Sequence, residues 1–377
     1  MKVIHILSGL YQGGAESQLE KLILFSKNEN ISHVVISLKN DKTPLMQRFR
    51  DGGITVHCVG FNGIGVFVGL FRLKALLKQL TTPTTVIQCW MYHANFFGLL
   101  AAWLIGVSGQ VVWNIRRTEL PKGLTGLLAT LSAKLSNILP VKIICCAEAA
   151  KESHIVAGYN SANMLVIHNG IDIELFKPDN EARVKFRNEI TVVDNDFVIG
   201  MVGRYAPIKG HTYLLQAFER LLIEGKNRSI KLVLVGREIE TALPLQALLA
   251  LPLIKINLIL LAERSDISKV MPGFDLLCLP SLSEGFPNVV AEAMASGVPA
   301  LVTDVGDAAI IVDNNDMVIA PADINKLTEK ISAFIDKSSS EKKEISERAR
   351  KLVVTQFSVE HAWQEYHELY KRIIEDN

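Results

Sequence analysis

Two glutamates eight positions apart are the residues whose types and spacing most directly suggest ligand chemistry. Glu284 stands in a polar loop after an apolar run at 276–279, and Glu292 stands in a predicted helix over 288–295. Pro287 suits the first turn of that helix because its φ is fixed and it has no N–H to satisfy. Free N–H groups at a helix start favour an anion. An anion site between two hydroxyl-binding carboxylates fits a nucleotide sugar, which carries a diphosphate between a sugar and a ribose.

Two cations follow another apolar segment, FVIGMV at 197–202. Gly203 and Arg204 come directly after this predicted strand, and Lys209 precedes Gly210 and a predicted helix. Arginine and lysine at such a position can stabilise the negative charge that develops on a departing diphosphate.

Both groups resemble motifs of the retaining GT-B glycosyltransferases of family four, the group 1 type. Glu284-GFPNVVA-Glu292 is similar to the family's Glu-x7-Glu motif, in which the first Glu contacts the transferred sugar and the second contacts the ribose. Gly203-RYAPIK-Gly210 is similar to the family's GR…KG motif, whose Arg and Lys bind the donor diphosphate. The resemblance implies a set of donor-binding residues: Gly13, Gly14, Gly203, Arg204, Lys209, Glu284, Gly285, Phe286, Pro287, Asn288, Val289 and Glu292.

The amino-terminal half adds a glycine pair and a histidine. Gly13 and Gly14 do not have G-x-G-x-x-G spacing, and Lys39 stands where a dinucleotide site has an acid, so a dinucleotide-binding Rossmann motif is excluded. By resemblance, the glycine pair lies beside the donor diphosphate. His93 follows a strand predicted over VIQCWMY, and the resemblance implies that it approaches the transferred sugar. From the residues alone, a hydrogen-bonded structural histidine remains an equal alternative.

Arg116 and Arg117 end the next predicted strand, and we expect one of them to face an acceptor phosphate. The sequence does not show which. The predicted catalytic residues are Glu284, His93, Arg204 and Lys209.

Alternating strands and helices must position these residues, and they predict an α/β protein with two doubly wound parallel sheets. By resemblance this is the GT-B fold, with two Rossmann-like domains. We expect an acceptor-side domain over 1–170, joined by a carboxyl-terminal helix at 358–377, and a donor-binding domain over 171–357. The predicted strands are 3–7, 33–38, 54–59, 86–90, 111–115, 142–146, 164–167, 197–202, 231–235, 256–261, 276–279, 300–303 and 317–319.

Composition and charge limit the cellular setting. The longest apolar run, 96–105, is too short to cross a bilayer, and the start of the chain has no signal-peptide cleavage pattern. Five scattered cysteines suggest neither a disulfide framework nor a metal site, which fits a reduced cytosol. Residues 1–185 carry 19 basic and 12 acidic side chains, whereas the remainder carries 21 and 27. With amphipathic segments at 66–80 and 123–139, this asymmetry predicts peripheral docking on the anionic cytoplasmic face of an inner membrane. Ordinary core helices with a solvated basic face are the alternative.

Asp194-Asn195-Asp196 is similar to a D-x-D metal motif, but it precedes a predicted strand instead of following one. We therefore expect no metal and no cofactor. The chain also departs from the family at Ala262, Asp307 and Ile310, where family members often have Gly, Gly and Glu.

The predicted function is retaining transfer of a sugar from a nucleotide-sugar donor, with a UDP-sugar favoured. The predicted acceptor is a lipid-linked saccharide in bacterial surface polysaccharide synthesis, for O-antigen or capsule. No nucleic-acid partner is expected. A nucleotide-sugar epimerase of the same fold and a non-catalytic nucleotide-sugar sensor are the alternatives, and product analysis separates them.

Overall fold

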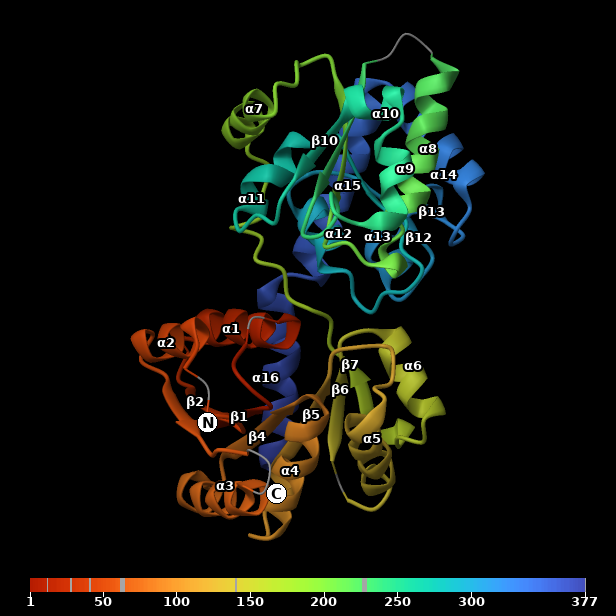
Figure 1. The fold of residues 1–377 in the computed structure, drawn as a ribbon. Coiled ribbons are helices and arrows are strands. Elements are labelled where there is room, and N and C mark those ends of the chain that lie inside the picture. The colour runs from red at the N-terminus through yellow and green to blue at the C-terminus, as the bar shows by residue number, and fades with distance from the viewer. Residues whose placement is uncertain are drawn as a thin grey trace. The chain divides into compact units, whose positions relative to one another are not determined.

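The computed structural model describes residues 1–11, 13–27, 29–40, 42–61, 65–139, 141–225 and 229–376. The chain forms two compact units. Unit 1 comprises Met1–Gly170 and Val359–Asn377, and unit 2 comprises Ile171–Ser358. Each unit is a parallel sheet flanked by helices (Figure 1). The predicted pair of doubly wound parallel sheets is confirmed.

The sheet of unit 1 has seven strands in the order β3-β2-β1-β4-β5-β6-β7. Apolar β-branched residues such as those of KVIHIL bury both faces of the central strands, as a sheet covered by helices on both sides requires. In chain order the strands are β1 (Lys2–Leu7), β2 (Ser32–Ser37), β3 (Thr55–Cys58), β4 (Thr85–Trp90), β5 (Val111–Ile115), β6 (Lys142–Cys145) and β7 (Met164–Val166).

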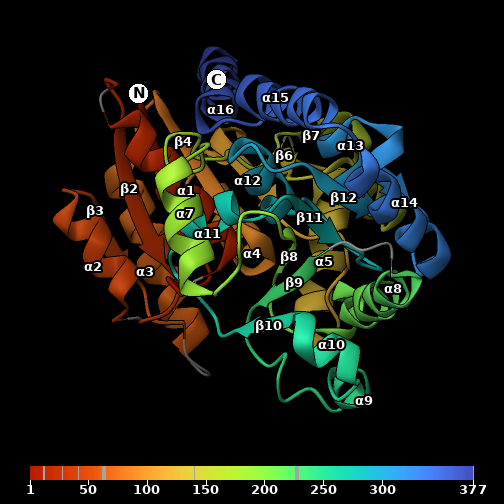
Figure 2. The same cartoon turned by 90° about the horizontal axis from the view of Figure 1, so that it is seen from above.

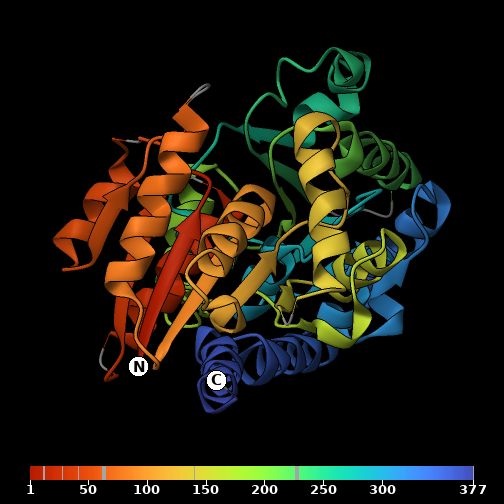
Figure 3. The same ribbon diagram turned by 90° about the horizontal axis from the view of Figure 1, so that it is seen from below.

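Helices cover both faces of this sheet. One face packs against α1, α2 and α16 through a shared apolar core, and the orange α3 and α4 lie in front of the strands in Figure 3. The helices are α1 (Gly14–Ser26), α2 (Pro44–Asp51), α3 (Val66–Leu80), α4 (Met91–Trp103), α5 (Gly123–Ser136), α6 (Glu148–Val156) and α16 (Val359–Glu375). No helix in the described part of the chain is long and apolar enough to cross a membrane.

The final helix, α16, is part of the core of unit 1 although the whole of unit 2 precedes it in the chain. It places Trp363, Tyr366 and Tyr370 against the sheet, each at most 2% exposed. The Tyr366 hydroxyl accepts a hydrogen bond from Asn114 at 2.6 Å, and the Tyr370 hydroxyl donates to Gln88 at 3.1 Å. Its blue ribbon among the red and orange elements of unit 1 shows this placement (Figure 1).

The sheet of unit 2 has six strands in the order β10-β9-β8-β11-β12-β13. Helix α8 packs against α10 and α14, and α12 packs against α15; α8 to α10 lie beside β8 to β10 in Figure 2. The strands are β8 (Phe197–Val202), β9 (Ile230–Val235), β10 (Leu258–Leu261), β11 (Leu276–Leu279), β12 (Ala300–Thr303) and β13 (Val318–Ile319). The helices are α7 (Asn180–Glu189), α8 (His211–Glu224), α9 (Gln246–Leu249), α10 (Pro252–Asn257), α11 (Ile267–Val270), α12 (Asn288–Ala295), α13 (Ala308–Val312), α14 (Ile324–Asp336) and α15 (Ser339–Gln356).

Several predicted boundaries differ from the structure, most of them by a single residue. The strand expected at 256–261 begins only at Leu258, because Pro252 starts helix α10 and that helix continues to Asn257. The strand expected over 86–90 ends at Trp90 as predicted and begins one residue earlier, at Thr85. The strand expected at 317–319 loses its first residue to a 3-10 turn, and the helix expected over 123–139 ends at Ser136.

Candidate active site

The carboxyl ends of β8 and β11 lie side by side in unit 2, where the strand order reverses. Open parallel sheets bind ligands outside the carboxyl ends of their strands at such a switch point. The two predicted donor motifs directly follow these two strands, at Gly203 and at Ser281. The topology therefore brings both motifs to one edge.

The loop after β8 is held by backbone contacts that leave its arginine exposed. Tyr205 donates its backbone N–H to the Arg237 carbonyl at 2.8 Å, which ties this loop to the loop after β9. Arg204 is solvent-exposed, and its guanidinium donates to the Tyr205 carbonyl at 3.4 Å. Its charge is thus available at the edge of the sheet.

Gly210 brings the two motif loops into direct backbone contact. Its φ is +77°, and a Cβ built there would overlap the carbonyl oxygen of Pro280 in the loop after β11. Leu282 also donates its N–H to the Ile208 carbonyl at 2.7 Å. Only glycine combines this left-handed backbone with so close an approach. The contact also places the preceding residue, Lys209, beside the loop after β11.

Lys209 and Glu284 form a bidentate ion pair. The Lys209 Nζ lies 2.8 Å and 3.0 Å from the two carboxylate oxygens of Glu284. The buried Ser281 hydroxyl donates to the same carboxylate at 2.7 Å. The Glu284 side chain is only 9% exposed, so the charge-assisted bonds offset the loss of its hydration. Two residues predicted to act on one donor therefore orient each other, and Ser281 joins them as a supporting residue that the sequence analysis missed.

The turn after β12 packs against the loop that carries Glu284. Gly306 has a φ of +58°, and a Cβ there would overlap the Gly285 carbonyl oxygen. Asp307 donates its N–H to that same oxygen at 2.9 Å and is fully buried. The departure from the family at Asp307 therefore falls at a residue that packs under the loop.

Helix α12 begins beside this loop and carries the second glutamate. Pro287 is its N-cap, with φ −75° and ψ 91°, and not a residue of the first turn as predicted. Proline has no side-chain cap, so it leaves the first amides of the helix to other partners. Asn288 and Val289 are partly buried in the first turn, and Glu292 is partly buried one turn later. Phe286 packs on the ring of Phe357 at 5.6 Å, which anchors the helix entry.

A cavity of about 480 Å³ opens at the carboxyl ends of β9 and β10. Leu260, Leu261 and Ile239 contribute an apolar lining, and the exposed pair Arg237–Glu263, 3.2 Å apart, stands at its polar side. Gly236, also in the lining, packs directly against the backbone of Gly203, so this cavity adjoins the loop that carries Arg204.

In unit 1 the strand order reverses between β1 and β4, and the predicted residues follow these two strands. Gly13 is the extended N-cap of α1, and Gly14 is the first residue of that helix. A Cβ on Gly13 would lie 2.6 Å from the Glu16 carboxylate. Burial raises the pKa of Glu16. The protein's own carboxylate thus lies at the helix start that the resemblance places beside a diphosphate.

His93 lies in the first turn of α4, because the strand before it ends at Trp90. The junction residue Met91 has a φ of +70°, which strains the backbone of a residue other than glycine. Burial, and next the charge of Lys39, lower the pKa of His93. The imidazole is therefore neutral at neutral pH and can both donate and accept a hydrogen bond.

The two arginines after β5 have different surroundings. The Arg116 guanidinium donates to Asn114 at 3.1 Å, to Tyr366 at 3.0 Å and to Asn169, and it lies over the Trp90 ring. Arg117 is exposed, and its charge acts on Tyr92 and His154. Arg116 is thus held by the core of unit 1, and Arg117 is the arginine open to solvent.

Two family models match the chain in succession. The model described as Glycosyltransferase Family 4 matches residues 12–175, and the model described as Glycosyl transferases group 1 matches residues 183–352. The chain belongs to the family-four glycosyltransferases. This confirms the predicted family.

Named relatives of this glycosyltransferase extend over most of its length. It is 26% identical to the capsular polysaccharide biosynthesis glycosyltransferase CapM of Staphylococcus aureus, over 93% of this chain and 99% of that protein. It is 28% identical to the UDP-Gal:alpha-D-GlcNAc-diphosphoundecaprenol alpha-1,3-galactosyltransferase of Escherichia coli, over 65% of this chain and 64% of that protein.

Solved structures support the fold. Anabaena Alr3699/HepE in complex with UDP has a TM-score of 0.84 at 20% identity, over 99% of this chain and 100% of that chain. A glycosyltransferase from Rickettsia africae ESF-5 has a TM-score of 0.83 at 19% identity, over 100% of this chain and 99% of that chain. The predicted GT-B fold is confirmed.

The D-x-D sequence of the glycosyltransferase has a structural role in its second half. The buried Asp196 carboxylate accepts the Val193 N–H at 2.9 Å and the Ser229 hydroxyl. These bonds fix the turn that leads into β8, at the amino end of the sheet and opposite the motif loops.

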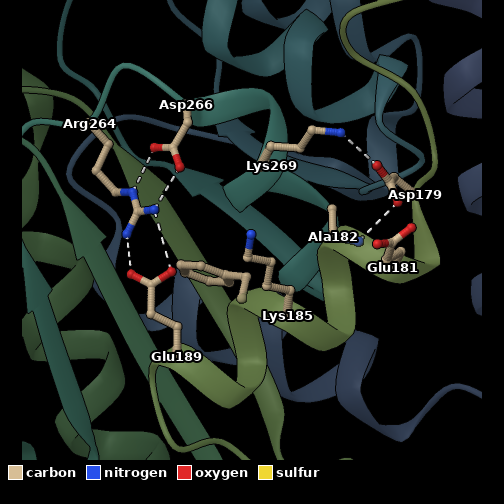
Figure 4. Close-up of a pocket in the computed structure, with 9 residues that line it drawn as sticks. Asp179, Glu181, Ala182, Lys185, Glu189, Arg264, Asp266 and Lys269 are labelled. Carbon is tan, nitrogen blue, oxygen red and sulfur yellow. Dashed lines mark hydrogen bonds and ion pairs between the residues drawn. The ribbon is translucent and has the colours of Figure 1, made fainter.

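A cavity of about 350 Å³ between α7 and α11 is lined by paired charges (Figure 4). Arg264 bridges Glu189 and Asp266, and Lys269 lies 2.9 Å from Asp179. The pairing holds α7 against the loop after β10. None of the predicted donor-binding residues lines this cavity.

Proposed function

We propose that the glycosyltransferase moves a sugar from a UDP-sugar to a lipid-linked saccharide, with retention of configuration, during synthesis of a bacterial surface polysaccharide. The observation that carries the proposal is the Lys209–Glu284 pair at the switch point of unit 2, beside Arg204 and the start of α12. This arrangement offers cations and amides to a diphosphate, and a carboxylate to sugar hydroxyls.

The proposed step needs no metal and no covalent intermediate with the enzyme. The bond from the sugar's anomeric carbon to the diphosphate oxygen breaks, and Arg204, Lys209 and the first amides of α12 stabilise the departing charge. The acceptor hydroxyl attacks from the same face, and its proton passes to the leaving phosphate oxygen. Glu284 orients the sugar, Glu292 binds the ribose, and neutral His93 binds sugar hydroxyls.

Three similar proteins and one cavity favour a uridine nucleotide and a surface polysaccharide. The HepE structure contains UDP, and the Escherichia coli relative is named for a UDP-Gal donor and a diphosphoundecaprenol-linked acceptor. CapM is named for capsular polysaccharide biosynthesis. The cavity beside Gly236 lies next to the proposed diphosphate loop and has the apolar lining that a flat base needs.

A lipid-linked acceptor stays in its bilayer, so we further propose peripheral docking of unit 1 on the anionic cytoplasmic face of the inner membrane. Unit 1 carries 18 basic and 13 acidic side chains. The exposed apolar residues Phe67 and Phe71 on α3, and Leu124 and Leu127 on α5, give it insertable surface. Co-sedimentation with liposomes should require anionic lipid and weaken with salt. Protein that stays in the supernatant at low salt would contradict docking.

Product analysis tests the proposed function. Purified protein is incubated with UDP-sugars, with and without an acceptor saccharide on a diphosphate-linked alkyl chain, and the products are analysed by mass spectrometry and NMR. We expect a new α- or β-glycoside whose anomeric configuration matches that of the donor. Inversion of that configuration contradicts retention. An epimerised nucleotide sugar formed without acceptor indicates the epimerase alternative, and binding without any product indicates a sensor.

A further inference from the structure

The carboxyl ends of β1, β2 and β3 in unit 1 hold two exposed cations that the donor chemistry does not use. We propose that Lys39 and Arg72 form a subsite for the diphosphate of a lipid-linked acceptor, with the exposed start of α3 as the contact for its isoprenoid chain. The inference deepens the proposed function and rests on it.

Lys39 is the second residue after β2, and its side chain reaches toward the loop after β1. Its Nζ lies 5.4 Å from the centre of the Tyr11 ring, in the loop after β1. Its charge also acts on His93 after β4, the residue proposed to approach the transferred sugar. Lys39 therefore lies between His93, where the sugar is proposed to react, and the strands β2 and β3 at the side of the sheet.

Arg72 reaches the same edge from α3. A Cβ placed on Gly60 would lie 3.4 Å from the Arg72 Nη1 and 3.1 Å from the Asn40 amide nitrogen. The guanidinium and this amide therefore converge over the chain that leaves β3. Asn40 adjoins Lys39 in the chain, and β2 lies between β1 and β3, so the two cations stand on either side of the chain that leaves β2. Two cations and an amide suit a diphosphate, which carries two adjacent anionic groups.

An apolar ridge continues from the cations. Phe67, Val68 and Phe71 in the first turns of α3 are 74%, 53% and 69% exposed, and Arg72 follows them directly. Single exposed apolar residues are ordinary, but three on one short helical segment beside a pair of cations form an amphiphilic surface. A diphosphate-linked isoprenoid saccharide has its chain, its diphosphate and its sugar in sequence. The ridge matches the isoprenoid chain, the two cations match the diphosphate, and His93 matches the sugar, in the same spatial order.

Two synthetic acceptors with the same saccharide test the subsite: one joined through a diphosphate to a short isoprenoid chain, the other joined directly to that chain. Their affinities are measured by calorimetry in neutral detergent micelles, so that no anionic lipid takes part. Lys39→Gln and Arg72→Gln should each weaken binding of the diphosphate acceptor about tenfold, as loss of one charged hydrogen-bond donor does. Both variants should bind the phosphate-free acceptor as the wild type does. Lys78→Gln, at the exposed last turn of the same helix, is the matched control and should bind both acceptors normally.

The outcomes separate the subsite from the proposed function. Equal affinities of variants and wild type for the diphosphate acceptor would overturn the subsite, as would an equal loss with the phosphate-free acceptor. An effect seen only on anionic vesicles would assign these cations to membrane headgroups and also overturn it. If the wild type binds the diphosphate acceptor through Lys39 and Arg72 but transfers no sugar to it, the subsite stands and the proposed reaction fails.

Discussion

The two units place their candidate residues at equivalent switch points but build the two edges differently. In unit 2 the motif loops pack backbone to backbone at Gly210, and Lys209 and Glu284 hold each other in place. In unit 1 the corresponding edge presents side chains from several separate elements, among them Lys39 and the half-exposed Tyr11.

This difference fits the two ligands that we propose. Every nucleotide-sugar donor carries a diphosphate, so a rigid backbone cradle can serve many donors. Acceptors differ in sugar and linkage, and an edge made of single side chains can change by substitution without disturbing a packed loop. Specificity for the acceptor is therefore expected to reside in unit 1.

The largest loss of turnover is expected when the cations of the unit 2 edge are removed. Lys209→Ala and Arg204→Ala should each lower turnover on the order of a hundredfold, as the loss of preorganised charge at a leaving group does. Steady-state rates with saturating donor measure this. Lys343→Ala, an exposed lysine of unit 2 on α15, is the control. If both variants turn over at the wild-type rate, Lys209 and Arg204 do not bind the donor diphosphate as proposed.

The ion pair makes a second prediction about the same edge. Because Lys209 and Glu284 orient each other, the double variant Lys209→Ala/Glu284→Gln should lose less activity than the two single effects combined. Additive losses would show that the two side chains act independently in the transition state.

Substitution of Glu292 should mainly affect nucleotide binding, and substitution of Glu284 should mainly affect turnover. Glu292→Gln should weaken UDP binding about tenfold, because a ribose contact is present in the free nucleotide. Glu284→Gln should mainly lower turnover, because UDP has no sugar for it to hold. Calorimetry with UDP decides, and an equal loss of affinity in both variants would mean that the roles are assigned wrongly.

Acid should affect unit 1 through a buried histidine pair. His5 and His33 lie 3.0 Å apart between their ring nitrogens, and His33 also bonds Ser26 at 2.9 Å. Burial lowers the pKa of His33 to about 4, and burial followed by the charge of His33 lowers that of His5. The unfolded chain therefore binds protons first as pH falls. Stability that is fully present well above pH 6.5 is lost as pH falls toward 4, by about 2 kcal/mol for His33 between pH 7.5 and 5.

Tryptophan fluorescence isolates this effect, since all four tryptophans of the chain lie in unit 1. Urea unfolding at pH 7.5 and at pH 5 should show a smaller acid loss for His33→Gln than for the wild type. The partly exposed His361→Gln serves as the control. An unchanged acid loss in His33→Gln would show that this pair does not set the acid sensitivity of unit 1.

The smallest expected effect is that of chelation. EDTA should leave transfer unchanged, because the second aspartate of the D-x-D sequence already holds a turn at the amino end of the unit 2 sheet. Loss of activity that Mg²⁺ or Mn²⁺ restores would contradict this.

Local sequence patterns were sufficient for most of the fold. The helices Val66–Leu80 and Asn288–Ala295 and the strand Leu276–Leu279 have the predicted bounds, because their apolar spacing agrees with the fold. The start of the strand expected at 256–261 was predicted wrongly because helix α10 ends at Asn257 and the strand begins at the next residue, with no loop between them.

The site was predictable as a set of residues and not as a set of contacts. Short motifs placed Lys209 and Glu284 in one site, but their pairing across 75 positions depends on the reversal of strand order, which periodicity does not reveal. The same holds for Arg116, whose partner Tyr366 comes from the last helix. The sequence placed Lys39 near a strand end, but its contact with Tyr11 and its effect on His93 are found only in the structure.

The place of α16 in unit 1 has a consequence for how the chain is made. A ribosome delivers all of Ile171–Ser358 before it delivers the helix that carries Trp363, Tyr366 and Tyr370. Unit 2 can therefore close its core during synthesis, whereas the half translated first must wait with an apolar sheet face uncovered. This reverses the usual amino-to-carboxyl order in which domains mature during translation. The first half of the nascent chain therefore keeps part of its apolar sheet face exposed until α16 is made.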